Sequence, residues 1–175
     1  AGIARLVELT NDSWDATAAT WPQRGPVVLF DEASRIIVRP VSRWTGLPLD
    51  EAEVASFAAD MVTLVDGFAT AGPRHWRARR ARHRREKWIA DLVVRIRNGE
   101  AAAPLGSVLE RIVVHRDLDG ELLDPRLAAV ELINVIRPTV AVSWFVAYAA
   151  HALHRWPANR KPLAEGDRAY TEAFA

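Results

Sequence analysis

Apolar residues recur at helical spacing along most of the chain, and this pattern predicts a mainly α-helical protein. Proline and glycine mark the breaks between the periodic segments. A short β-prone run at 27–30 is at most one strand, and an acidic turn is expected at 117–120. Helices are expected over residues 1–20, about 31–44, 50–67, 72–99, 107–113 and 124–155.

The predicted helix starts carry residues that are typical of helix caps. Asp31 is placed to cap the second helix, in which Pro40 makes either a kink or a stop. Asp50 and Glu53 form a capping-box-like pair at the start of the third helix. The second and third helices are therefore expected to begin at these residues.

The segment 124–155 is the longest predicted helix, and it would span about 45 Å. Its central part, 131–153, is apolar nearly all round, so it is either buried on most sides or lies in a membrane. Glu131, Asn134 and Arg137 interrupt the uncharged run that a membrane span needs, which favours a core helix and no membrane span. Trp144, Phe145 and Tyr148 are expected in the core. The other helices supply only some of the neighbours that such a helix needs, which suggests missing chain.

The Arg137–Pro138 step carries the most chemistry in this helix. Proline disfavours α geometry at the residue before it, so a kink or local unwinding is expected at Arg137. A buried cation must be paired, yet none of the neighbours on its helical face is a carboxylate. Its partner is either a carboxylate, from a ligand or from another element, or the backbone carbonyls that the kink frees. Ala141, one turn later, leaves room beside the guanidinium, which suits bidentate binding of a carboxylate.

Composition and charge exclude several classes of function for this chain. The 175-residue chain has no cysteine, which excludes a disulfide framework, a thiolate nucleophile and cysteine ligation of zinc or haem iron within it. No signal-peptide pattern opens the chain, so a cytoplasmic protein is expected. The formal net charge of +1 hides an asymmetry, because positions 74–87 hold eight of the 23 basic and one of the 22 acidic residues.

The basic run at 74–87 has several interpretations. It can be a solvated or ion-paired helix face, for which the acidic residues of 50–66 are obvious partners. It can instead contact a redox partner, or it can make the chain a helical binding module for nucleic acid or an acidic protein. His151 and His154 are three residues apart and could share a metal, but no third ligand has a suitable spacing.

Three segments resemble one known family. The runs INVIRPTVAVSWF (133–145), GPRHW (72–76) and RARRAR (77–82) are similar to the bacterial fatty-acid hydroxylases of the cytochrome P-450 superfamily, which are haem-thiolate peroxygenases. The resemblance covers the whole chain. Ordinary members of the superfamily carry an acid–alcohol pair where this chain has Pro138 and Thr139, with Arg137 ahead of them.

The resemblance implies a function and a set of site residues. It implies a partial P-450-type helical fold in which the long kinked helix passes over the distal face of haem b. Hydrogen peroxide would hydroxylate a long-chain fatty acid at the α or β carbon, with no reductase and no nucleic acid involved. Arg137 would hold the substrate carboxylate, which would act as the acid–base group. Ala141 would contact the substrate, and Pro138 and Ala141 would face the haem. Val65 and Phe68 would either line the fatty-acid channel or pack in the core.

The family also implies further chain on both sides of residues 1–175. Its axial cysteine is expected downstream of Ala175, so no metal ligand is expected within 1–175. We therefore interpret 1–175 as an internal segment of a single larger haem-enzyme domain, without a domain boundary of its own.

Overall fold

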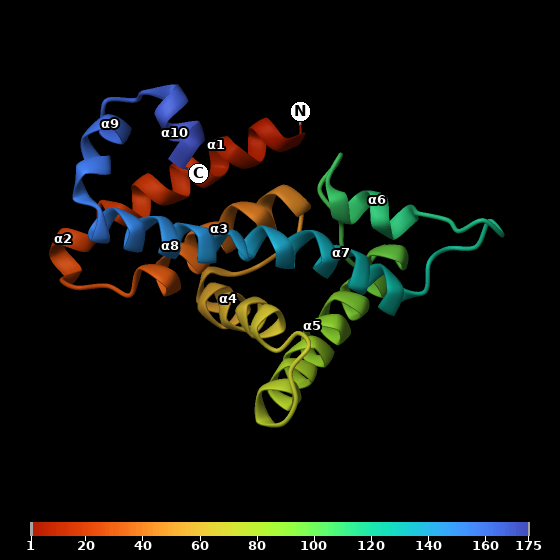
Figure 1. Ribbon diagram of the computed structural model, residues 1–175. Coiled ribbons are helices and arrows are strands. Elements are labelled where there is room, and N and C mark those ends of the chain that lie inside the picture. The colour runs from red at the N-terminus through yellow and green to blue at the C-terminus, as the bar shows by residue number, and fades with distance from the viewer. Residues whose placement is uncertain (1, 175) are drawn as a thin grey trace.

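The computed structural model describes residues 2–174, and these residues form helices and no strand (Figure 1). The mainly α fold class is confirmed. An isolated antiparallel bridge joins Arg116 to Leu122 in the loop before α7. In chain order the elements are α1 (Gly2–Ala18), α2 (Trp21–Arg24), α3 (Leu29–Thr45), α4 (Glu51–Asp66), α5 (Pro73–Arg97), α6 (Val108–Val114), α7 (Pro125–Val140), α8 (Val142–Arg155), η1 (Pro157–Asn159), α9 (Arg160–Ala164) and α10 (Arg168–Phe174).

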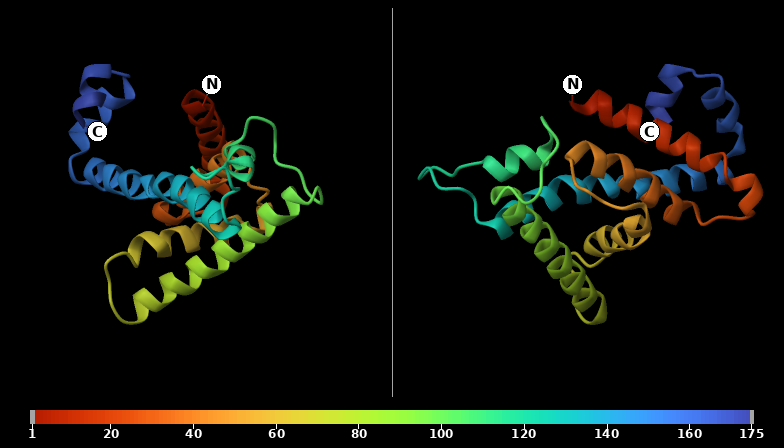
Figure 2. Two further views of the ribbon diagram at one scale, coloured as in Figure 1. Left: turned by 90° about the vertical axis from the view of Figure 1, so that its right-hand side faces the viewer. Right: turned by 180° about the vertical axis from the view of Figure 1, so that it is seen from behind.

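The core forms where α7 packs against α3, α4, α5 and α6 (Figure 2). One face of α7 is buried there, whereas α8 continues past this core and packs mainly on α3. The largest fully buried side chains come from five different helices, which meet in this core. They include Ile36, Phe57, Ile89, Leu109 and Leu132.

The β-prone run at 27–30, for which at most one strand was expected, forms no strand, because α3 begins within it at Leu29. Val28 is extended and occupies the N-cap position, so Asp31 lies in the first turn and is not the cap. Ala33, fully buried, lies one turn after Leu29. The apolar run therefore joins the helical pattern that follows it, instead of pairing with a second strand.

The helix α3 continues through Pro40, where a kink or a stop was expected. A proline inside a helix leaves the carbonyl four residues earlier without its N–H donor. Here that carbonyl belongs to Ile36, and the Ser13 hydroxyl of α1 donates a hydrogen bond to it at 2.9 Å. A neighbouring helix thus satisfies the group that Pro40 leaves unpaired.

The helices α4 and α5 form a projecting hairpin whose crossing depends on Gly67. A Cβ atom at this position would overlap the Cβ of Ala78 in α5. Asp50 occupies the N-cap position of α4, as predicted, although its side chain makes no capping hydrogen bond. The expected ranges of α4, α5 and α6 agree with the structure to within about two residues.

The predicted single helix over 124–155 is divided at Ala141 into α7 and α8. Local unwinding at Arg137 itself, one of the two expected outcomes, does not occur, because this residue lies within α7 and its carbonyl accepts the Ala141 N–H at 3.0 Å, and the helix is interrupted one turn later. Ile133, Ile136 and Val140 are buried on the same helix. Their packing outweighs the local preference that proline imposes on the preceding residue.

The expectation that Phe145 and Tyr148 lie in the core is also wrong, since their exposed fractions are 71% and 68%. Trp144 does pack inward, edge-to-face on Phe30 with ring centroids 4.7 Å apart. The physical reason is that α8 buries only Ser143 fully, since α3 is its main neighbour. The stretch Pro125–Arg155 has the length and apolar composition of a membrane span, with a mean hydropathy of 1.4 in its most apolar window, 33% of which is buried in the protein.

Candidate functional site

Arg137 lies near the end of α7 at the edge of the buried helix face. Its side chain is half-buried, next to the fully buried Ile136 and the exposed Pro138. Within residues 2–174 its guanidinium makes no hydrogen bond and no ion pair, although a buried or half-buried cation normally has a partner. Neither a freed backbone carbonyl nor a distant aspartate therefore holds it in this part of the chain.

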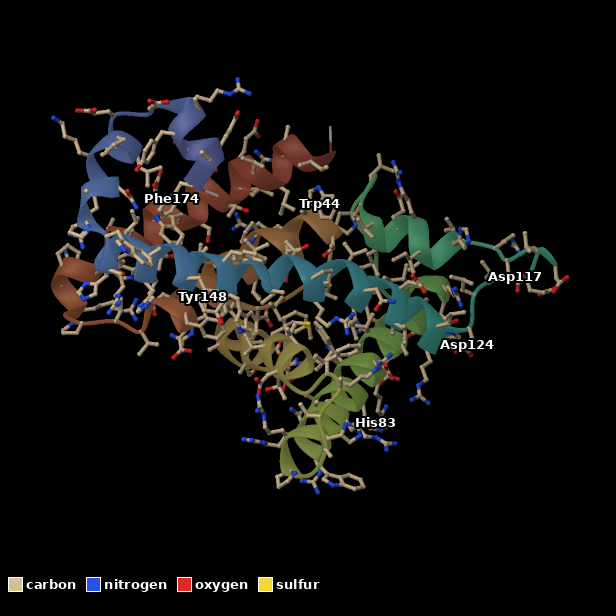
Figure 3. The ribbon with its side chains drawn as sticks, in the orientation of Figure 1. Trp44, His83, Asp117, Asp124, Tyr148 and Phe174 are labelled. Carbon is tan, nitrogen blue, oxygen red and sulfur yellow. The ribbon has the colours of Figure 1, made fainter. Side chains whose placement is uncertain are left out.

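Arg137 begins a stripe of residues on one side of α7 and α8. Ala141, Phe145 and Tyr148 follow at intervals of four, four and three residues, which places them on the same helical face. Figure 3 shows Tyr148 on α8, beyond the end of α7. Ala141 is half-buried, whereas the two aromatic side chains are exposed. We call Arg137, Ala141, Phe145 and Tyr148 the α7–α8 stripe.

The α7–α8 stripe combines one cation with an apolar surface. A guanidinium binds a carboxylate through two parallel hydrogen bonds. The exposed aromatic rings that follow it suit an apolar chain or a flat apolar group. The arrangement therefore suits an amphiphile that has an acidic head.

The hydroxyl group on α7 nearest to Arg137 belongs to Thr139, and its proton is already donated within the helix. Its Oγ1 donates to the Val135 carbonyl at 2.9 Å within the same helix. Pro138 has no backbone N–H, and Ala141 has no polar side-chain atom. This turn of the helix therefore offers a ligand one charged group and no free carboxyl group.

Val65 and Phe68 lie at the C-terminal end of α4. Val65 is half-buried in the last turn of α4, and Phe68, just after the helix, is 77% exposed. The helix α4 packs against α7, so the helices that carry Val65 and Arg137 are neighbours. A cavity of about 750 Å³ lies elsewhere, between α1, α3 and α4, and none of the predicted site residues lines it.

Most of the basic run is paired with acidic residues, as one of the interpretations predicted. Asp60 of α4 accepts hydrogen bonds from Arg84 at 2.6 Å and from Arg85 at 2.7 Å. Asp66 pairs with Arg74. In the described part of the chain, Arg77, Arg79 and Arg80 have no acidic partner. The charge of this run is thus neutralised over part of its length only.

Glu32 is a buried acid that no sequence motif pointed to. Arg24 donates to both of its oxygens at 2.8 and 2.9 Å, and the Trp21 indole N–H donates at 3.1 Å. The hydrogen bonds from Arg24, the largest cause, lower the pKa of Glu32 despite its burial. Arg35, one turn later on α3, also donates to Glu32 at 3.2 Å, but the two donors that set its environment lie eight and 11 residues away, where no local sequence pattern marks them.

The histidine pair of α8 does not form part of a metal site in the structure. His151 and His154 are both exposed, and no group of three or more histidine, aspartate or glutamate residues within 2–174 could hold a metal ion. In the described residues, the two histidines are therefore not accompanied by the further ligands that a metal site needs.

The chain is similar to several solved structures of cytochromes P450, although no family model matches it. Cytochrome P450SP alpha (CYP152B1) in complex with (R)-ibuprofen is 34% identical, with a TM-score of 0.84 over 93% of this chain and 40% of that one. Cytochrome P450EX alpha (CYP152N1) with myristic acid is 32% identical, with a TM-score of 0.83 over 94% and 39%. Cytochrome P450 OleT is 25% identical, with a TM-score of 0.88 over 94% and 40%. The chain thus spans about 40% of the length of these structures.

Variants of P450SP alpha are among the similar structures. In one of them an arginine is replaced by glutamate, and in two others the alanine four residues later is replaced by glutamate or histidine. Arg137 and Ala141 have the same types and the same spacing in this chain. The family resemblance that the sequence predicted is confirmed, and the helical fold is that of these structures.

Proposed function

We propose that this chain, which belongs in sequence and fold with the CYP152 cytochromes P450, is part of an enzyme that hydroxylates long-chain fatty acids with hydrogen peroxide. The observation that carries the proposal is the half-buried Arg137 guanidinium, which has no anion partner in residues 2–174 and begins the α7–α8 stripe. A fatty acid has the matching chemistry, since its carboxylate would pair with Arg137 and its chain would lie on apolar surface.

The ligands named for the similar proteins support a carboxylic-acid substrate. P450EX alpha was solved with myristic acid, a long-chain fatty acid, and P450SP alpha with ibuprofen, which is also a carboxylic acid. The arginine and alanine that were altered in P450SP alpha have the spacing of Arg137 and Ala141. Both observations favour Arg137 as the residue that binds the carboxylate.

Anchoring the carboxylate determines which carbon is oxidised. The α and β carbons are one and two bonds from the carboxyl carbon, so a carboxylate held at Arg137 keeps them close to a fixed point. The carboxylate also replaces the acidic side chain that this turn of α7 lacks. Its oxygen can take a proton from hydrogen peroxide and return it to the oxygen that leaves, which is general acid–base catalysis by the substrate.

The haem b implied by the family fits this chain in part. The chain has no cysteine, so the thiolate ligand of the iron would have to come from residues outside it. Pro138, Ala141 and the exposed aromatic residues of α8 offer an apolar surface on which one face of the macrocycle could lie. The bound haem would supply the oxidation of the C–H bond, and hydrogen peroxide carries both oxidising equivalents, so no reductase is required.

Replacement of Arg137 in the complete enzyme tests the proposal. Arg137→Ala should lower peroxide-driven turnover of a long-chain fatty acid by about 30-fold or more, since removing one partner of a buried charge pair costs about 2–5 kcal/mol. Haem content, measured from the absorption spectrum, should stay unchanged. Arg155→Ala, an exposed arginine at the end of α8, is the matched control and should be neutral. Turnover of Arg137→Ala within about twofold of wild type would refute the anchoring role.

A neutral substrate tests the acid–base role separately from binding. Peroxide-dependent oxidation of an uncharged aromatic compound should be slow, because this substrate brings no carboxylate. A short carboxylic acid, too short to reach the position of oxidation, should stimulate the reaction in wild type and should have no effect in Arg137→Ala. Equal rates with and without the acid would mean that the protein supplies its own proton relay.

A further inference from the structure

We propose that the apex of the α4–α5 hairpin docks on the surface of an anionic lipid bilayer. We call Trp76, Arg77, Arg79 and Arg80, in the first two turns of α5, the basic apex. The inference rests on the proposed function, because a long-chain fatty acid partitions into lipid bilayers and an enzyme that uses it gains from access to that pool.

The ion pairs of α5 concentrate its unpaired positive charge near the hairpin connection. Asp60 and Asp66 of α4 neutralise arginines on the side that faces α4, and Lys87 pairs with Asp91 farther along α5. Three exposed arginines without an acidic partner in residues 2–174 lie together in the basic apex. A fully solvated helix start would not need this clustering next to an aromatic residue.

Trp76 gives the basic apex an apolar group with a polar edge. Its side chain is 59% exposed, and the guanidinium carbon of Arg79 lies 6.0 Å from the centre of its ring. Tryptophan and arginine together are typical of the region where lipid headgroups meet acyl chains. The indole can therefore enter the headgroup layer while the arginines bind phosphates.

A positively charged groove continues from the basic apex along α5. It has a volume of about 590 Å³ and lies between α5 and the start of α7, and one of its lining residues, His83, is labelled on α5 in Figure 3. Its one acidic residue, Glu86, is buried and is held by Arg82 and Arg126. The groove thus presents cations to an anionic headgroup. Its lining residues are His75, Arg79, Arg82, His83, Glu86, Arg126 and Val130.

The shape of the hairpin favours a flat surface over an extended polymer. Figures 1 and 2 show that α4 and α5 project from the rest of the chain and that their connection forms the outermost point of this projection. The unpaired arginines of the basic apex cluster at that end of the hairpin, because Asp60 and Asp91 pair with basic residues farther along α5. Val65 and Phe68, for which the family resemblance implies contact with the substrate, lie in the same hairpin, so docking would bring their end of α4 to the bilayer.

Binding of the complete protein to vesicles tests the proposal. Wild type should sediment with vesicles of equimolar phosphatidylglycerol and phosphatidylcholine, should do so much less with phosphatidylcholine alone, and should be released by salt. Arg79→Glu/Arg80→Glu should lower the partition coefficient by about tenfold or more, since each basic residue near such a surface contributes about fivefold. Trp76→Ala should also weaken binding, with less effect on the salt dependence.

The matched control is Arg95→Glu/Arg111→Glu, which makes the same charge change at exposed arginines away from the basic apex. The control should bind like wild type. Equal loss in both double variants, equal binding of wild type to neutral vesicles, or tighter binding to a duplex DNA oligonucleotide than to the anionic vesicles would each overturn the proposal.

A turnover assay separates this inference from the proposed function. With a water-soluble short-chain fatty acid and no vesicles, Arg79→Glu/Arg80→Glu should turn over like wild type. With a long-chain fatty acid supplied in anionic vesicles, the variant should be slower by about the factor that it loses in binding. Absence of turnover by wild type in both assays would refute the proposed function, whereas equal turnover of variant and wild type from vesicles would refute docking alone.

Discussion

Replacement of Gly67 by alanine should destabilise the protein by steric overlap alone. The backbone φ of Gly67 is −85°, which alanine adopts without strain. The added Cβ would overlap the Cβ of Ala78 and would lie 3.1 Å from the Thr63 carbonyl oxygen. Overpacking of a buried site costs about 1–3 kcal/mol, and the lower entropy of the unfolded alanine chain offsets about 0.4–1 kcal/mol of this. We expect a net loss of about 1–2 kcal/mol.

A second substitution identifies the cause of that loss. Ala78→Gly alone should cost about 1 kcal/mol, because glycine is a poor helix former. In Gly67→Ala/Ala78→Gly the overlapping atom is gone, so the double variant should be more stable than the sum of the two single effects predicts. Equilibrium denaturation of the complete protein, followed by helical circular dichroism, gives the three free-energy differences. Additive effects, or a Gly67→Ala variant as stable as wild type, would show that α4 and α5 are not in contact at this crossing.

Two further predictions concern polar groups that lie between helices. Glu32→Gln should cost about 1.5–3 kcal/mol near neutral pH, because it removes the charge that Arg24 binds. Since the pKa of Glu32 is lowered in the folded protein, its stabilising effect is present above about pH 4.3 and is lost as the pH falls through the folded-state pKa. Stability should therefore fall less steeply on acidification in Glu32→Gln, as acid titrations at fixed denaturant can measure. Ser13→Ala should cost about 1 kcal/mol by thermal denaturation, and the cost should disappear in Pro40→Ala, in which residue 40 again supplies an N–H to the Ile36 carbonyl.

The helices could be predicted because their signals are local, whereas the behaviour of the prolines depends on partners far away in sequence. Pro40 does not stop α3, because Ser13 lies 23 residues before the carbonyl that it satisfies. Pro138 does not unwind α7 at Arg137, because the core holds that turn in place. The helical periodicity also contained Leu29, yet four successive apolar residues at 27–30 suggested a strand. Short apolar runs are ambiguous in this way until their neighbours are known.

The candidate site was predictable where one residue carried the chemistry. Arg137 stood out because an arginine in an apolar helix without a carboxylate on its own face needs a partner from elsewhere. The exposure of Phe145 and Tyr148 was not predictable, because apolar composition shows that a helix face needs cover and does not show what covers it. The position of the unpaired positive charge on α5 was not predictable either. The basic run is continuous in sequence, and only the ion pairs with Asp60 and Asp66 reveal which arginines have no acidic partner.

The exposed stripe and the unpaired arginine have one common explanation. A helix such as α8, which packs on one face mainly against α3, would ordinarily carry polar residues on its other face. Here that face carries aromatic and small apolar side chains, with one cation at its start and no acid within α8. Packing against another protein element would cover the apolar residues but would still have to supply an anion for Arg137. The proposed fatty acid, bound beside an apolar cofactor, would meet both requirements and would account for the order of the cation and the aromatic residues on the same stripe.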